Sequence, residues 1–249
     1  MLGSTLRGLF AHTFVLAVLL SVVACSGGSH SDNCNPPPVG MVGWWPGDGN
    51  GTDLVEGDTA VGADGATFAP GLIGQAFALD GLSSYFSAPD DPELNPTAAI
   101  TVSAWVKRSA FVGSYDPVVK KAGAASGYAL EFEDIGRQER IKFWVYLDSV
   151  GWIASVLGPG APVPLGSWTH LAGVFDGAAV RVYVDGVEAS SAVATGAIVP
   201  STSDLELGRD PSNTYRHYSG LIDDAAVYGR ALSASEIKQI AMLKTGFCP

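Results

Sequence analysis

Two glutamates close together in the sequence are the first candidates for chemistry. Glu131 and Glu133 lie two residues apart in the segment "YALEFE", where apolar residues alternate with the acids. Residues i and i+2 of a β-strand point to the same face, so the two carboxylates are expected to lie side by side, as a glycosidase requires for its acid and its nucleophile. The alternation with Leu130 and Phe132 is equally typical of a half-buried strand with a solvated polar face. We favour the solvated face and assign no catalytic residue.

Other catalytic motifs are missing from the sequence. It contains no His-Glu-x-x-His, no Gly-x-Ser-x-Gly, no P-loop and no cysteine pair at zinc-binding spacing. His170 alternates with Trp168 in "SWTHLAGVF" and is expected to be a structural side chain of a strand. His217, in "YRHYSG", is expected in a loop and is a candidate for ligand binding.

The composition limits the class of protein. The 249 residues are 47% hydrophobic and include 31 Gly and 15 Pro, which is typical of an all-β protein with many turns. The formal net charge is −11, and the few Lys and Arg residues are scattered, so we do not expect the protein to bind nucleic acid.

Short apolar segments recur about every ten residues, separated by turn residues, and this spacing predicts a β-sandwich or barrel. Alternation is clearest in "VRVYVDG", where Val180, Val182 and Val184 alternate with polar or aromatic residues. Asp-Gly pairs at 80–81, 176–177 and 185–186 predict tight turns between strands. One helix is expected near the end, where "SASE" at 233–236 matches a capping box before "EIKQIAMLK".

The N-terminal segment is expected to direct export. Arg7 precedes an apolar run that is too short to span a membrane. Its end, "VVAC" at 22–25, resembles the lipobox of bacterial lipoproteins, and this resemblance implies lipidation of Cys25 and a lipid-anchored location in the cell envelope. The alternative is ordinary cleavage after Ala24. We therefore divide the chain into a signal peptide (1–25), a Gly/Ser/Pro-rich tether (26–38) and a folded domain (39–249).

The three cysteines support this division. If Cys25 carries lipid, Cys34 and Cys248 remain at the two ends of the domain. We expect a disulfide between them, which would stabilise the domain by roughly 5 kcal/mol at most by closing a very long loop. The alternative is two free thiols.

Several segments in order resemble the LamG-like, or concanavalin A-like lectin/glucanase, family. They are "GWWPGDGNGTDLVEG", "GATFAPGLIGQAFALDG", "AITVSAWVKR", "GSWTHLAGVFDGAAVRVYVDGV", "LELGR" and "GLIDDAAVYGRALSASEI". The resemblance implies a jelly-roll sandwich of two antiparallel sheets, used by most members for binding or adhesion rather than catalysis. Laminarinase-type glycosidases of the superfamily carry Glu-x-Asp-x-x-Glu on one strand. Here Glu131 fits the first position, but Glu133 replaces the Asp and Gly136 replaces the acid.

The same resemblance divides the aromatic residues into two groups. Trp105 and Trp168 lie in segments shared with the family and are expected to be buried. Trp144, Tyr146 and Trp152 lie in the less familiar middle of the chain and are expected to face a ligand, since sugars bind to aromatic faces.

Family members often carry structural calcium, and the residues that could hold it here are at the two ends of the domain. The loop "PGDGNGTD" supplies Asp48, Asn50 and Asp53, and the last strand supplies Asp223 on its apolar side. Asp224 is expected to point to solvent. The alternative is that these residues cap turns.

Three functions remain: a noncatalytic surface module that binds a glycan or a surface protein, a glycoside hydrolase, and a structural or adhesive lipoprotein. The first is favoured.

Overall fold

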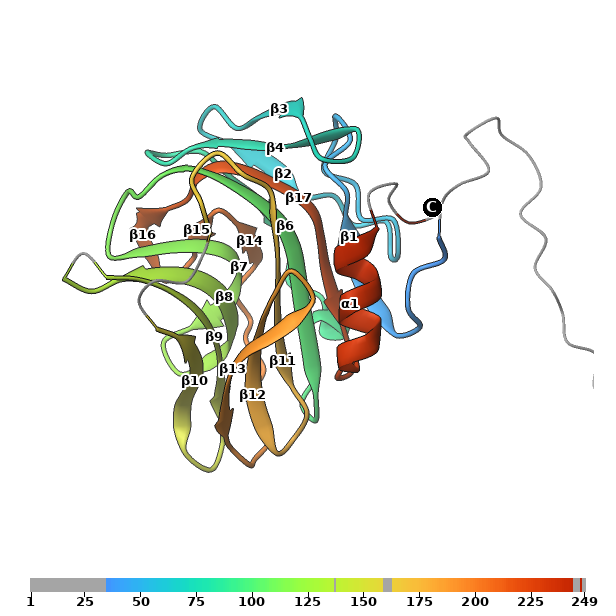
Figure 1. Ribbon diagram of the computed structural model, residues 1–249, viewed down its shortest axis with the longest axis vertical. Helices are drawn as coiled ribbons and strands as arrows, with labels where there is room; N and C mark the ends of the chain where they lie inside the picture. Colours follow the sequence, from blue (N-terminus) through green and yellow to red (C-terminus); the bar gives the residue numbers. More distant parts are fainter. Residues whose placement is uncertain (1–34, 137, 159–162, 244–246, 248–249) are drawn as a thin grey trace, which may run out of the picture. The chain divides into compact units, whose positions relative to one another are not determined.

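The computed structural model describes residues 35–136, 138–158, 163–243 and 247, which form an all-β sandwich of two antiparallel sheets (Figure 1). The signal peptide, Cys25, Cys34 and Cys248 lie outside the described residues. The predicted fold class is confirmed. None of the described helices is both long and apolar enough to cross a membrane.

The first sheet has eight strands. In spatial order they are β13 (Val187–Val193), β12 (Ala179–Val184), β11 (Thr169–Phe175), β6 (Ile100–Ala110), β17 (Ser219–Tyr228), β4 (Gln75–Asp80) and β3 (Thr67–Pro70), with β1 (Met41–Trp45) also paired to β17.

The second sheet has seven strands, and a small hairpin accompanies it. The order is β10 (Gly151–Leu157), β9 (Glu139–Leu147), β8 (Ser126–Asp134), β7 (Tyr115–Gly123), β14 (Leu205–Leu207), β5 (Tyr85–Ala88) and β2 (Val61–Ala63), and the hairpin pairs β15 (Arg209–Asp210) with β16 (Asn213–His217).

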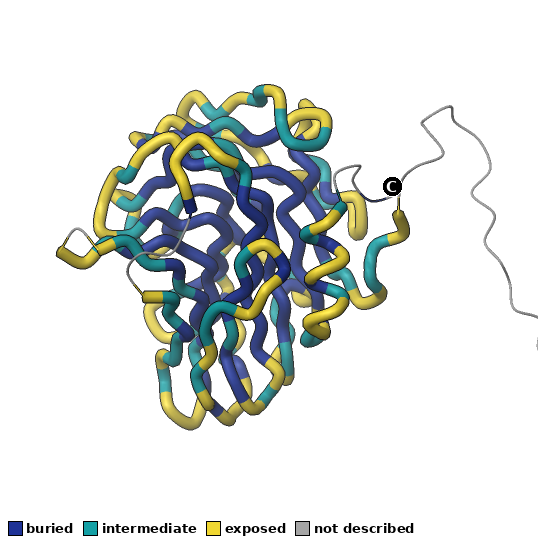
Figure 2. The backbone as a smooth tube through the Cα atoms, in the orientation of Figure 1, coloured by how far each residue is buried: buried dark blue, intermediate teal, exposed yellow. Residues whose placement is uncertain are grey.

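The core fills the space between the sheets. Figure 2 shows the central strands as mostly buried and the loops as mostly exposed. Phe143 of β9 packs against Gly173 of β11, where a Cβ atom would lie 2.0 Å from the Phe143 ring. Glycine at this position therefore lets the two sheets approach each other closely. The Asp-Gly pairs lie at turns as predicted, and at 185–186 both residues adopt positive φ, at 47° and 78°.

The outer face of the eight-stranded sheet is covered by α1 (Ala234–Met242), next to β1 and β17 in Figure 1. The helix starts at a complete capping box between Ser233 and Glu236, as predicted. Two residues of the helix, Ile237 and Ile240, face the sheet and pack with Trp44, Tyr228 and Phe247. A 3-10 helix, Pro92–Leu94, precedes β6.

Short and less apolar strands were not predicted from the sequence. Strands β2, β3, β13, β15 and β16 lie in segments with few large apolar residues. Their pairing depends on neighbouring strands rather than on local propensity.

Candidate functional site

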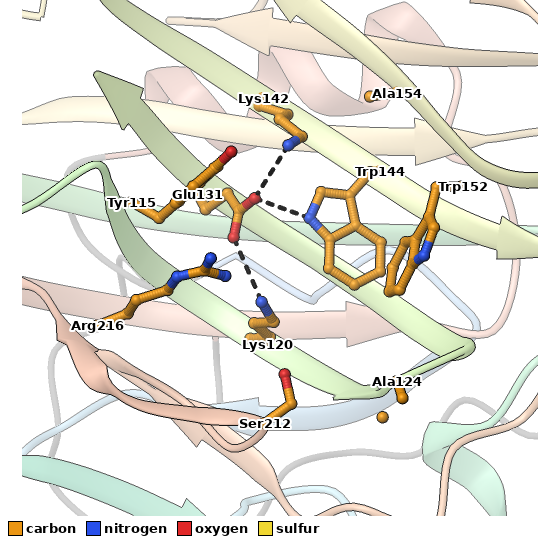
Figure 3. Close-up of a pocket in the computed structure, with 11 residues that line it drawn as sticks. Tyr115, Lys120, Ala124, Glu131, Lys142, Trp144, Trp152, Ala154, Ser212 and Arg216 are labelled. Atoms are coloured by element: carbon orange, nitrogen blue, oxygen red, sulfur yellow. Dashed lines mark hydrogen bonds and ion pairs between the residues drawn. The ribbon is translucent and has the colours of Figure 1, made fainter. Parts of the chain in front are cut away.

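A pocket of about 330 Å³ lies on the outer face of the seven-stranded sheet. Figure 3 shows Glu131 of β8 at its centre, with Lys142 and Trp144 of β9 on one side and Lys120 of β7 on another. The lining residues come from five strands and two turns and are Tyr115, Lys120, Gly123, Ala124, Glu131, Lys142, Trp144, Trp152, Ala154, Ser212 and Arg216.

Strand alternation places these side chains on one face. Leu130 and Phe132 point into the core, so Glu131 and Glu133 point outward. Glu131 lies directly across from Lys142 in the pairing of β8 with β9. The small side chain of Ala154, opposite Trp144 on the edge strand β10, leaves the space that the pocket occupies.

Glu131 is the buried centre of an ion-pair network. It is 2% exposed, its Oε1 accepts a hydrogen bond of 2.8 Å from Trp144 Nε1, and Lys142 Nζ lies 3.4 Å from the same oxygen. Its Oε2 lies 3.6 Å from Lys120 Nζ and has no hydrogen-bond donor among the described residues. This oxygen is a buried acceptor at the floor of the pocket.

The expectation that the face shared by Glu131 and Glu133 is solvated is wrong. They share the outer face as predicted, but Glu133 is also buried, and Lys142 Nζ donates to it at 3.2 Å. The lysines of the two neighbouring strands and the aromatic residues shield both acids from water, and no feature of "YALEFE" alone predicts that shielding.

Asp210 extends the network below the pocket. It is fully buried, and Lys120 Nζ donates to its Oδ2 at 2.7 Å. Burial alone would raise the pKa of Asp210, but hydrogen bonds from Lys120 and Ser212 outweigh burial and lower the pKa below its usual value. Asp210 is therefore a fixed negative charge that holds Lys120 in place.

Two of the three aromatic residues predicted to face a ligand, Trp144 and Trp152, line the pocket, whereas Tyr146 does not line it. The rings of Trp144 and Trp152 meet edge to face with centroids 4.1 Å apart, and Tyr146 packs against Trp152 at 5.0 Å. Trp144 is buried, whereas Trp152 is 48% exposed. Trp152 therefore offers an open aromatic surface beside the buried acceptor of Glu131.

Other sequence-predicted residues lie elsewhere. His217 does not line this pocket; it is buried, and its Nε2 lies 2.9 Å from the Thr214 carbonyl oxygen. His170 is structural as expected, packed edge to face on Trp105 with centroids 5.3 Å apart. Trp105 is buried as predicted, but Trp168 is only half-buried because it precedes β11.

The four predicted calcium ligands each accept hydrogen bonds from backbone N–H groups. Asp48 accepts from Gln75, Asn50 from Thr52, Asp53 from Trp44 and Val55, and Asp223 from Leu72 and Ile73. Within residues 35–243 as described, no group of three or more His, Cys, Asp or Glu side chains is placed to hold a metal ion. These bonds fit the turn-capping alternative, and calcium binding stays a prediction.

Asp223 and Asp224 are both buried. Asp223 is fully buried, and burial raises its pKa to about 7. The expectation that it shares the inner face with Ala225 and Val227 is wrong, because it pairs with Trp105, whose neighbours Ala104 and Val106 are the residues that face the core. The expectation that Asp224 is solvated is wrong: it is 9% exposed and accepts a bond of 2.8 Å from Trp44 Nε1. An irregularity in the β17–β6 pairing, where Asp224 has a φ of 48°, turns this residue under α1.

Sequence reasoning missed the cations of the pocket. Lys142 lies two residues before Trp144 in "IKFWVYL", so strand alternation places this lysine on the same face as Trp144, which the sequence analysis did not use. Lys120 and Arg216 lie at the pocket only because strands distant in the sequence are neighbours in the fold, and no local sequence pattern indicates this.

The fold and the site define a jelly-roll domain with a ligand-sized pocket on one sheet face. The chain belongs to the concanavalin A-like lectin/glucanases superfamily, whose family model matches residues 80–238. No curated protein gave a significant match.

Solved structures share the fold. Domain 4 of AbnA, a GH43 extracellular arabinanase from Geobacillus stearothermophilus solved with arabinotriose, is 22% identical with a TM-score of 0.64, covering 81% of this chain and 98% of that domain. The binding domain of Paraclostridial Mosquitocidal Protein 1 is 13% identical, with a TM-score of 0.61 over 76% of this chain and 48% of its own length. The binding domain of botulinum neurotoxin DC in complex with SialylT is 10% identical, with a TM-score of 0.62 over 81% of this chain and 50% of its own length. The chain thus spans about half the length of these two toxin domains, and at such identities the likenesses establish the fold.

Proposed function

We propose that this protein is a noncatalytic carbohydrate-binding module whose ligand binds in the pocket on the outer face of the seven-stranded sheet. The observation that carries the proposal is the buried Oε2 of Glu131, which accepts no hydrogen bond from the described residues and lines the same pocket as the exposed ring of Trp152. A sugar hydroxyl would donate to Oε2, and the apolar face of the sugar ring would pack on Trp152. The pocket volume is at the lower end of the range for small-molecule sites.

The structural neighbours are compatible with this proposal, because one was solved with arabinotriose and another with SialylT. A surface protein is the alternative partner. It would contact a wider area than the pocket and would not depend on one exposed indole ring.

The test is a glycan array followed by calorimetric titration of each hit. We expect Trp152→Ala to weaken binding about fivefold or more without lowering the melting temperature, since stacking on an aromatic platform contributes about 1–3 kcal/mol. Leu82→Ala is the matched control, because Leu82 is 77% exposed and does not line the pocket. Equal affinity of wild type and Trp152→Ala for every hit rejects this site.

The noncatalytic part of the proposal rests on Glu131 and Glu133, which are both engaged by Lys142, and on Gly136, which stands where the related glycosidases carry an acid. Incubation with each bound oligosaccharide should release no shorter product on chromatography. Hydrolysis by the wild type that disappears in a folded Glu131→Gln variant would establish a glycosidase instead.

We also propose that the domain is exported and anchored by lipid at Cys25, on the "VVAC" motif. Mass spectrometry of the membrane fraction should find a diacylglyceryl cysteine at the mature N-terminus. A mature chain that starts at Cys25 without lipid argues for ordinary cleavage.

A further inference from the structure

Positive charge gathers at the pocket although the chain is acidic overall. Lys120, Lys142 and Arg216 line it, and Glu131 is its one lining carboxylate. The whole chain has 14 Lys and Arg residues against 25 Asp and Glu residues. Three cations in one small pocket therefore stand out from the rest of the molecule.

The simplest explanation is that these cations only neutralise the buried acids beside them. That explanation fits Lys120, whose side chain is 5% exposed and lies between Asp210 at 2.7 Å and Glu131 at 3.6 Å. Because breaking a buried network is costly, Lys120 has a sufficient structural role.

Arg216 is not required for that role. Asp210 already accepts hydrogen bonds from Lys120 at Oδ2 and from Ser212 at Oδ1, so the Arg216 bond of 2.9 Å to Oδ2 is an addition. The Arg216 side chain is 34% exposed, and its guanidinium lies 4.2 Å from the ring centroid of Tyr115. Tyr115 thus holds the guanidinium in one plane at the rim of the pocket.

The guanidinium also keeps free donors. Within the part of the chain that the structure describes, Arg216 donates through Nη1 alone, which leaves Nε and Nη2 for a ligand. Lys142 lies across the pocket from it, with its side chain 18% exposed. A planar carboxylate is the group that a fixed guanidinium binds best, through two parallel hydrogen bonds.

We propose that the pocket selects an acidic saccharide of the uronic acid class. This inference rests on the carbohydrate-binding function proposed above. The sugar carboxylate would bind Arg216 and Lys142 at the rim, a ring hydroxyl would donate to Glu131 Oε2 at the floor, and the ring would pack on Trp152. A neutral sugar would leave the donors of Arg216 in water, so the carboxylate is the source of selectivity.

The experiment compares matched acidic and neutral ligands. Oligosaccharides of galacturonate, mannuronate and glucuronate, each with its methyl ester, are titrated against the whole exported protein. For at least one sugar we expect the free acid to bind about tenfold or more tightly than its ester. Arg216→Gln should reduce that ratio to near one, because the free acid then loses the paired hydrogen bonds that its ester cannot make.

Lys238→Gln is the matched charge control, because Lys238 is exposed on α1 and does not line the pocket. It removes the same single charge and should leave the ratio intact. Circular dichroism melting of both variants checks that each is folded.

The outcomes separate the two proposals. Equal binding of every acid and its ester, together with loss of binding in Trp152→Ala, overturns the acidic-sugar inference and keeps the carbohydrate-binding function. A ratio that is unchanged in folded Arg216→Gln overturns the inference in the same way. No binding of any acidic or neutral glycan overturns both.

Discussion

The two outer faces of the sandwich follow the same alternation but carry opposite chemistry. On the eight-stranded sheet, a cluster of apolar outward residues, among them Ala172, Val174 and Ala226, is covered by α1. On the seven-stranded sheet, the outward residues of β7 to β9 include Lys120, Glu131 and Lys142, and no described helix covers them.

The difference shows which face is built for stability and which for a ligand. The covered face buries apolar area, which stabilises the fold directly. The open face buries charges, and such pairs add little net stability compared with apolar residues of the same size. A charged network with an unpartnered carboxylate oxygen is therefore better explained by binding than by folding.

The largest predicted effect concerns the chain ends beside the covered face. Asn35 and Phe247 form an isolated parallel β-bridge, which brings together the chain neighbours of Cys34 and Cys248. We expect these cysteines to be bridged, and Cys248→Ser to lower the free energy of unfolding by up to about 5 kcal/mol. Peptide mapping without reductant checks the bond, and recovery of both cysteines in alkylated form rejects it.

The second prediction tests the cost of the charged network. Glu131→Gln leaves Lys120 and Lys142 without their shared carboxylate, so it should lower the free energy of unfolding by about 4 kcal/mol. Glu133→Gln is the control, because Glu133 pairs with the partly exposed Lys142 alone among the described residues, so this variant should lose clearly less stability than Glu131→Gln. Urea denaturation measures the free energy of unfolding of both variants. Equal and small losses would show that Glu131 and Glu133 only form a polar face of the strand.

The third prediction tests the covered face. Ile237 of α1 is fully buried, and Ile237→Ala should lower the free energy of unfolding by about 3 kcal/mol through the cavity it leaves. Affinity for the glycan should stay the same at a temperature where the variant is folded. A loss of affinity there would show that the two faces are not independent.

The fourth prediction concerns pH. Burial lowers the pKa of His170 to about 3, so the folded protein keeps this side chain neutral while the unfolded chain protonates near pH 6.5. The unfolded state binds more protons in this window, so stability is complete above pH 6.5 and falls as the pH falls towards 3. The expected loss is about 1.4 kcal/mol per pH unit well below 6.5.

His170→Phe should flatten this part of the curve between pH 6.5 and 5. The raised pKa of Asp224, about 6, acts in the opposite direction, so the comparison is between variant and wild type at each pH. Identical slopes for the two proteins would mean that His170 does not titrate on unfolding.

The sequence predicted the fold well because its evidence is local. Alternation in 180–184, the Asp-Gly turns and the capping box at Ser233 each depend on a few neighbouring residues. The three aromatic residues that the sequence analysis grouped by their place outside the family segments, Trp144, Tyr146 and Trp152, do lie together in the structure.

The site was predicted only in part because its charges meet through long-range pairing. Lys120 reaches Asp210 across 90 positions, and nothing near either residue in the sequence indicates the other. Asp224 was misplaced for a different reason. It lies on the face opposite Ala225 and Val227, as alternation places it, but Trp44 and α1 cover that face, and nothing near Asp224 in the sequence indicates the cover.

The most direct test of the binding face is a crystal structure of the domain with the tightest-binding oligosaccharide. We expect the sugar in the pocket of the seven-stranded sheet, with its ring on Trp152 and a hydroxyl within hydrogen-bond distance of Glu131 Oε2. Sugar density at any other surface, with this pocket empty, would contradict the assignment of the charged face as the binding site.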